Sequence, residues 1–152
     1  MMKNLIILLI LATHTCFSQH NLPKTPTEEN LVSMEDVNVD YEAENGQQYY
    51  KKGSNKPFTG FLSARYDNGE LESVQQYENG YGNGIWIDYD PDGKISCKGT
   101  YVNNRIEGPV TFYYEDGSIK STGQYRHFKR PIGLWKFYDR EGNIVSKRTY
   151  TR

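Results

Sequence analysis

The sequence predicts an all-β fold, an elongated antiparallel meander of about four 24-residue β-hairpin repeats behind an N-terminal capping hairpin. The composition agrees with strands separated by glycine turns, because the 152 residues include 13 Tyr and 14 Gly. The repeat itself shows in three columns. Glycines recur at spacings of 24, 24 and 25 residues, at Gly60, Gly84, Gly108 and Gly133. A second glycine column contains Gly69, Gly93, Gly117 and Gly142, and a tyrosine column contains Tyr77, Tyr101, Tyr125 and Tyr150.

The first 18 residues are expected to be a signal peptide. An apolar run over residues 5–12 precedes small residues at Cys16 and Ser18, so cleavage is expected between Ser18 and Gln19. The run is too short to span a bilayer, which takes about 20 residues. Two alternatives are a retained N-terminal anchor and a lipoprotein acylated on Cys16, although Thr13 stands where a lipobox usually has Leu. The protein is therefore expected to be exported, to the periplasm, the cell envelope or the medium.

Residues 19–35 are expected to form a flexible tether, and residues 36–152 the repeat domain. At the start of that domain, Val37, Val39 and Tyr41 alternate before a turn at residues 44–46, which predicts an atypical capping hairpin. Cleavage leaves Cys97 without a second cysteine, so no internal disulfide is expected and Cys97 is interpreted as a small, half-buried strand residue.

Each repeat is expected to be one hairpin. An aromatic, β-prone segment such as residues 85–89 leads into a turn such as Asp92-Gly93, where glycine supplies a positive φ. The returning strand, residues 95–101, alternates between an apolar and a polar face, which is typical of a half-buried antiparallel strand.

Glycines interrupt the buried face of two returning strands, at Gly99 and Gly123. A glycine inside a strand costs stability unless something must approach the backbone closely there. We therefore expect a neighbouring ring, such as Trp86 or Trp135, to lie across each gap.

The repeat columns also match a known pattern, Gly-x-Trp-x-x-Tyr, acid-Gly, Ile, Gly-x-Tyr, which occurs here from Gly84 to Tyr101. This pattern resembles the MORN-type repeat (membrane occupation and recognition nexus) in its bacterial variant form, over about residues 37–152. Leu62 and Val110 depart from it in the Trp column, and Arg148 in the Gly column. The resemblance implies an elongated hairpin array used for binding, and bacterial relatives are often described as antitoxin components of toxin–antitoxin systems.

No motif for catalysis was found, so an enzyme is not expected and no cofactor or metal is required. The mature chain keeps only His20 and His127, and it contains no His-x-Glu, Cys-x-x-Cys, Gly-x-Ser-x-Gly or Walker pattern. Residues 88–93 resemble a calcium loop in their alternating acids, but the position of the closing Glu is Gly99. A hairpin turn explains these acids.

Charge is divided unevenly along the chain. Residues 28–44 contain seven acids and no base, whereas residues 120–152 contain nine bases and two acids. The formal net charge of -1 argues against a nucleic-acid partner, which requires a basic footprint. The basic stretch either stays solvated and protects a sheet edge or faces an anionic partner. The candidate partner-binding residues are Tyr66, Tyr114, Arg126, His127, Phe128, Lys129 and Arg130.

These observations favour a non-enzymatic, exported protein-binding module, antitoxin-like or scaffolding, because Tyr and Arg are frequent in binding hot spots. The alternatives are binding of cell-wall carbohydrate through the aromatic-glycine repeats, and contact with anionic lipid.

Overall fold

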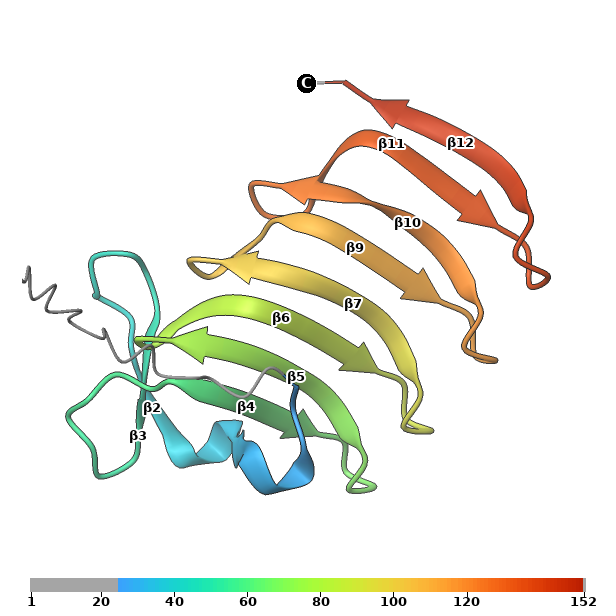
Figure 1. Cartoon of the computed structure of the whole chain (residues 1–152). Helices are drawn as coiled ribbons and strands as arrows, with labels where there is room; N and C mark the ends of the chain where they lie inside the picture. The colour runs from blue at the N-terminus through green and yellow to red at the C-terminus, as the bar shows by residue number, and fades with distance from the viewer. Residues whose placement is uncertain (1–24, 152) are drawn as a thin grey trace, which may run out of the picture.

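Four hairpins follow one another in the computed structural model, which describes residues 25–151 (Figure 1). They are β4 (Gly60–Arg65) with β5 (Leu71–Glu78), β6 (Tyr81–Tyr89) with β7 (Ile95–Val102), β9 (Gly108–Tyr113) with β10 (Ile119–Arg126), and β11 (Arg130–Tyr138) with β12 (Ile144–Tyr150). The sheet order is β1-β4-β5-β6-β7-β9-β10-β11-β12, and the short β8 (Arg105–Ile106) pairs with β7. All neighbours from β4 to β12 are antiparallel. The predicted meander is therefore confirmed.

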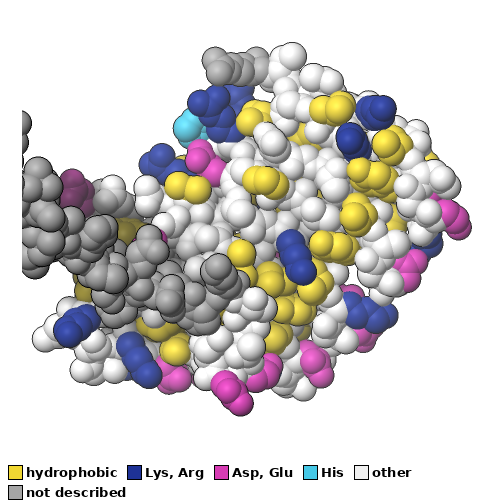
Figure 2. All heavy atoms as spheres, viewed as in Figure 1, with side chains coloured by type: hydrophobic (Ala, Val, Ile, Leu, Met, Phe, Trp, Pro, Cys, Tyr) yellow, Lys and Arg dark blue, Asp and Glu magenta, His cyan; other side chains and the backbone are white. Residues whose placement is uncertain are grey.

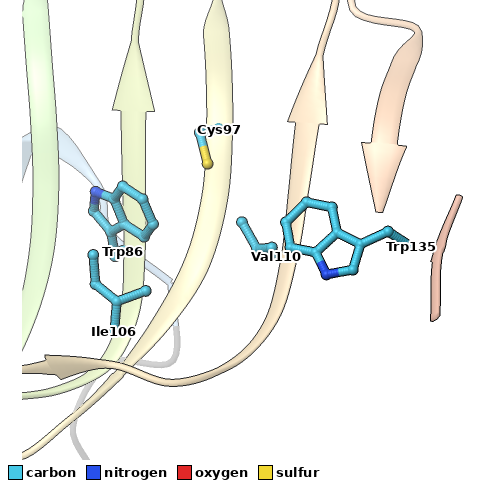
Figure 3. Close-up of a cluster of buried hydrophobic side chains, with 5 residues drawn as sticks. All are labelled: Trp86, Cys97, Ile106, Val110 and Trp135. Atoms are coloured by element: carbon cyan, nitrogen blue, oxygen red, sulfur yellow. The ribbon is translucent and has the colours of Figure 1, made fainter. Parts of the chain in front are cut away.

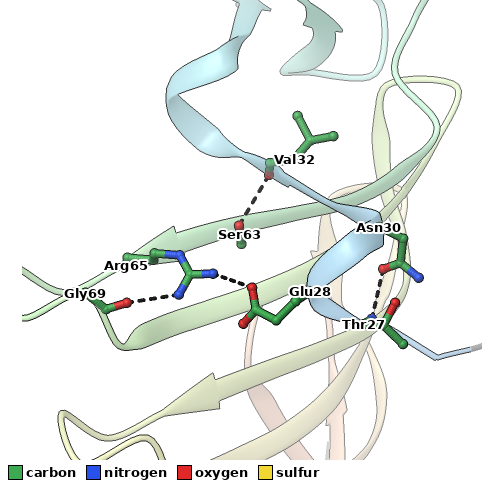
Figure 4. Close-up of polar contacts among 7 residues, drawn as sticks. All are labelled: Thr27, Glu28, Asn30, Val32, Ser63, Arg65 and Gly69. Carbon is green, nitrogen blue, oxygen red and sulfur yellow. Dashed lines mark hydrogen bonds and ion pairs between the residues drawn. The ribbon is translucent and has the colours of Figure 1, made fainter.

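The segment before the first repeat corrects the predicted tether over part of residues 19–35. It contains η1 (Glu28–Asn30), β1 (Leu31–Ser33) and η2 (Met34–Asp36), and β1 pairs in parallel with β4. Side chains hold it in place: the Asn30 carboxamide oxygen accepts from the Thr27 N–H at 2.9 Å, and Glu28 pairs with Arg65 at 2.6 Å (Figure 4). Val32 packs against the core, which a flexible tether would not do. The expected signal peptide, residues 1–18, and residues 19–24 of the tether lie outside the described residues.

The predicted capping hairpin is present as β2 (Val37–Asp40) and β3 (Gln48–Lys51), but these strands form a separate two-stranded sheet. Backbone hydrogen bonds link it to the first repeat, from the Tyr49 N–H to the Gly80 carbonyl at 2.8 Å and from the Phe58 N–H to the Tyr49 carbonyl at 2.8 Å. Tyr41 lies beyond the end of β2 and is 71% exposed, so the predicted alternation stops before it. A small core joins this hairpin to β4 and β5: Val37, Phe58, Leu62 and Tyr77.

The turns at the two borders of the sheet differ in geometry. At the border with the acid-glycine turns, the glycine N–H bonds to the carbonyl three residues earlier, and the glycine alone has positive φ in all four turns, between 77° and 89°. Each hairpin has a register shift beside its turn, which is typical of a type I turn followed by a bulge. At the opposite border, Asn79-Gly80 and Asn103-Asn104 take positive φ at both positions, as two-residue hairpin turns require.

One face of the sheet, here called the aromatic face, carries the main core (Figure 3). Across it, Gly99 lies directly opposite Trp86, and Gly123 lies opposite Val110. A Cβ on Gly99 would stand 2.7 Å from Trp86 Cε3, and one on Gly123 would overlap the Trp135 indole. The expectation that indoles cover these glycines is confirmed. Close approach of ring to backbone explains how a single sheet leaves each Trp only 5% exposed.

Cys97 lies on the aromatic face and is buried. Burial raises the pKa of its thiol to about 12, so the nucleophilic thiolate is scarce at neutral pH. Cys97 is thus a small packing residue, as expected.

Candidate functional site

The strongest candidate is the loop over residues 126–130, here called the basic loop, between β10 and β11. Its backbone is unusual, because His127, Phe128 and Lys129 all have positive φ, at 46°, 61° and 63°. Residues other than glycine rarely adopt this conformation, and each such residue stores strain. The loop carries the one extra residue of the 24, 24, 25 spacing. The third turn is therefore one residue longer than the Asn-rich turns beside it.

The strained backbone exposes Phe128 to solvent. A residue of the preceding repeat contacts the Phe128 ring. Phe128 is 70% exposed, and the Arg105 guanidinium lies 5.4 Å from the centre of its ring. The His127 N–H donates to Glu107 Oε1 at 3.3 Å, and His127 Nδ1 lies 3.6 Å from the same oxygen. Contacts from Arg105 and Glu107 therefore fix the outward direction of the loop. Figure 2 shows Lys and Arg side chains gathered around the histidine at the upper left.

Arg126 and Arg130 lie directly opposite each other at the start of the β10–β11 pairing, and both are exposed. Like charges at directly opposite positions destabilise a sheet. Together with His127 and Ile132 they border a hollow of about 230 Å³. An anion seated there would contact both guanidinium groups and remove their repulsion.

Lys129 points elsewhere and has a different role. Its Nζ lies 5.3 Å from the centre of the Trp86 ring, on the aromatic face, in a cation–π contact. Burial raises the pKa of Asp88, and the Lys129 charge opposes part of that rise; the Asp88 carboxylate accepts the Trp86 Nε1–H at 2.6 Å. Lys129 thus anchors the basic loop to the core, while Arg126 and Arg130 face solvent.

A groove of about 620 Å³ lies between the β2–β3 loop and the turn that precedes Arg105. The Asn104 side chain lines the groove and connects its two sides: Nδ2 donates to the Gln47 carbonyl at 2.7 Å, and Oδ1 accepts the Gly82 N–H at 2.6 Å. The groove is polar, with an acid on one wall and a guanidinium and a phenyl ring on the other. Its lining residues are Glu44, Asn45, Gly46, Gln47, Asn103, Asn104, Arg105 and Phe128.

The structure brings the five predicted residues of the basic loop together but separates Tyr66 and Tyr114 from them. These tyrosines lie at the opposite border of the sheet and are partly buried. The Tyr66 hydroxyl donates to the Tyr89 carbonyl at 2.9 Å, and the Tyr114 hydroxyl donates to the Tyr138 carbonyl at 2.8 Å. Each hydroxyl therefore joins one repeat to the next, and contact of these two tyrosines with a partner stays a prediction.

These bonds reveal a period of two repeats that the sequence columns did not suggest. Repeats one and three carry Tyr66 and Tyr114 before the turn, whereas repeats two and four carry Asp90 and Asp139, whose carboxylates accept N–H groups of their own turns. The Trp column alternates in the same way, as Leu62, Trp86, Val110 and Trp135. The tyrosine hydroxyls connect repeat one to repeat two and repeat three to repeat four, which explains why alternate repeats differ in sequence at these columns.

Arg105 and Glu107 were not predicted as site residues. A signal for Arg105 exists, because it stands three residues before Gly108 as Arg130 stands three before Gly133. Comparing the two turns column by column would have placed both guanidinium groups at one border. Glu107 has no such signal, since its contact with His127 depends on the handedness of the basic loop.

Asp88 and Trp135 both place polar atoms on the aromatic face, and these atoms differ in their hydrogen bonding. Burial raises the pKa of Asp88, against the lowering effects of the Trp86 N–H and the Lys129 charge. In the fourth repeat Phe137 stands where Asp88 stands in the second, and the buried Trp135 Nε1 has no hydrogen-bond partner among residues 25–151. On the aromatic face, the Trp86 N–H is thus paired with a carboxylate, whereas for the Trp135 N–H the corresponding position holds the apolar Phe137.

Asp88→Asn is expected to raise the free energy of unfolding, relative to the wild type, by more at neutral pH than in acid. The folded state raises the pKa of Asp88 above its ordinary 3.8, so the wild type loses stability as the pH rises from that value through the folded pKa. Asparagine does not titrate and its oxygen still accepts the Trp86 N–H. Urea unfolding from pH 3 to 7, about the range in which a carboxyl titrates, should show a difference that grows with pH. A constant difference would contradict the burial effect.

Among residues 25–151, no group of three or more His, Cys, Asp or Glu side chains is placed to hold a metal ion. In the stretch that resembles a calcium loop, Asp90 Oδ1 accepts the N–H groups of Asp92 and Lys94 at 3.0 and 2.9 Å. That carboxylate closes the turn. Within the same part of the chain, no helix is both long and apolar enough to cross a membrane.

The fold and surface define a class of protein, an open array of β-hairpin repeats with a polar groove and a basic loop at one border. Three consecutive segments, residues 83–103, 106–127 and 131–151, match the family described as MORN repeat variant. Residues 83–151 thus belong to the MORN repeat variant family, as the resemblance indicated. The first hairpin, with Leu62 in the Trp column, lies outside the matched segments.

Two solved structures show a weak similarity to this chain. A mutant of S. aureus TarM in complex with Fondaparinux, alpha-GlcNAc-glycerol and UDP is 8% identical, with a TM-score of 0.40 over 76% of this chain and 20% of that one. A structure of TarM is also 8% identical, with a TM-score of 0.34 over 75% of this chain and 19% of that one. This chain therefore spans about a fifth of the length of either. No curated protein is significantly similar to it.

Proposed function

We propose that this protein is a non-enzymatic, exported binding module whose basic loop docks onto an acidic surface of a protein partner. One observation carries the proposal: Arg126 and Arg130 face each other beside the exposed Phe128 on a strained backbone. Repulsion, strain and an exposed ring all cost free energy in the isolated chain. A partner with carboxylates around an apolar pocket would offset all three at once.

The residue types fit a protein surface. Arginine and aromatic side chains dominate the centres of protein interfaces, and arginine pairs well with carboxylates in two-point contacts. The adjoining groove carries Glu44 opposite Arg105, so it offers charges of both signs to an extended segment of the partner. An antitoxin-like or scaffolding role would use such a surface, and we propose it as the biological context of the module.

The glycan alternative finds less support. A sugar-binding ring must offer its face to solvent, and Trp86 and Trp135 are each only 5% exposed. Contact with anionic lipid would use the same positive charges as an acidic protein, so it becomes an outcome of the experiment below.

The test is affinity capture from native envelope and culture extract with the mature chain, residues 19–152, read by mass spectrometry. A matched bait carries Arg126→Glu and Arg130→Glu, the two exposed and opposed arginines of the basic loop. We expect one stoichiometric protein on the wild-type bait and its loss on the variant, with both baits folded by circular dichroism. Equal capture by both baits, or recovery of glycan or lipid alone, would contradict the proposal.

A further inference from the structure

The two ends of the sheet carry opposite charges on unpaired edges. At one end, no strand of the described part of the chain lies beyond β12 (Figure 1), and the exposed residues of β12 include Lys147 and Arg148. At the other end, η1 and η2 flank β1 and expose Glu29, Glu35 and Asp36. None of these five residues makes an ion pair within residues 25–151. Both ends therefore carry exposed charges that take no part in the ion pairs of residues 25–151.

The basic end also contains an internal conflict. Lys136 and Lys147 are directly opposite each other in the β11–β12 pairing. Like charges at such positions destabilise a sheet, and carboxylates placed at the β12 edge would reverse that effect. A second β12, by contrast, would bring more cations to the same edge. Charge therefore disfavours contact between two β12 edges and favours contact between a β12 edge and an acidic edge.

Strand direction allows such a contact. β1 runs parallel to β4, and the eight strands from β4 to β12 alternate in direction, so β12 runs opposite to β1. A second copy placed beyond β12 in the same orientation would bring its β1 antiparallel to β12. This is the pairing that the rest of the repeat array uses. Val145, 63% exposed on β12, would gain an apolar neighbour in Leu31 or Val32 of that copy.

From these observations we infer that copies of this chain associate head to tail, with the β12 edge of one copy against the η1–β1–η2 edge of the next. The contact joins two different surfaces, so it does not close on itself and can continue into a filament. It leaves the basic loop free, since that loop lies at the border of the sheet and not at its end. The inference is thus independent of the proposed function.

The test uses two reversed variants and their mixture, measured by sedimentation velocity over a range of concentrations. Variant one carries Lys147→Glu and Arg148→Glu, and variant two carries Glu35→Lys and Asp36→Lys. Each alone should lose at least about 100-fold in association constant, because juxtaposed like charges at an interface cost several kcal/mol. Mixed together, the variants regain complementary edges at every contact and should associate again.

A control with Lys98→Glu and Lys120→Glu makes the same change in charge as variant one, but on the inner strands β7 and β10, and should associate like the wild type. Raising the salt concentration should weaken wild-type association, since the attracting charges are exposed. This salt series tests the inference even if a variant fails to fold. A wild type that stays monomeric at all concentrations, a variant that associates normally, or a mixture that stays monomeric would overturn the inference.

Discussion

Gly123→Ala is expected to lower the free energy of unfolding by about 1–3 kcal/mol, the usual cost of overpacking a core. At an ordinary strand position the same change would gain about 0.5–1 kcal/mol, because alanine loses less backbone entropy than glycine on folding. Here the new Cβ would overlap the indole of Trp135, and the ring is held by Tyr125 at 5.2 Å and Tyr150 at 6.0 Å between ring centres. Urea unfolding monitored by Trp fluorescence measures the effect.

A double-mutant cycle supplies the control. Trp135→Val places at this position the side chain that Val110 contributes to the same column one repeat earlier. In that background the added methyl group has room, so Gly123→Ala should cost much less than in the wild type. Equal costs in both backgrounds, or an unchanged stability of Gly123→Ala alone, would show that the indole does not lie across this glycine.

Lys129→Glu is expected to lower both stability and partner binding, whereas Arg130→Glu should lower binding alone. Reversing Lys129 removes the cation–π contact with Trp86 and places a carboxylate near the half-buried Asp88. The lost contact alone contributes about 1 kcal/mol. Arg130 is exposed and opposes Arg126, so its reversal relieves a repulsion within the fold while removing a charge from the docking surface.

Urea unfolding measures the effect of each variant on stability, and titration with the captured partner measures its effect on binding. Asp88→Asn in the Lys129→Glu background should recover part of the lost stability, since it removes the like-charge pair. If both single variants bind equally weakly and unfold like the wild type, Lys129 is an ordinary surface charge and does not anchor the loop.

The repeat columns predicted most of the fold because each column reflects a backbone or packing requirement within a single hairpin. A positive φ requires glycine in the acid-glycine turns, and the alternation of the returning strand follows from the pleat. Even the indoles over Gly99 and Gly123 were predictable, since a strand glycine without a turn calls for a close neighbour. The parallel pairing of β1 was not predicted, because three residues carry too little pattern to distinguish a short strand from a tether.

The candidate site could be predicted only in part. The extra residue and the cluster of bases indicated the basic loop, and the structure shows those residues exposed at one border. The sequence did not indicate that the Tyr66 and Tyr114 hydroxyl groups join neighbouring repeats, because their acceptors are backbone carbonyls that no sequence column marks. Arg105 and Glu107 were missed because they meet the loop only through pairing of neighbouring hairpins.

The sequence by itself determined the β-hairpin array, its four turns and the face that each strand buries, since these depend on spacing and backbone preference within one repeat. Only the tertiary structure decided which charges act together. It placed the Lys129 ammonium over the Trp86 ring, set Arg126 opposite Arg130, and left acids and bases at opposite ends of one sheet. The physical reason is that electrostatic and cation–π contacts depend on distances between repeats, which the curvature of the sheet and the handedness of a single loop establish.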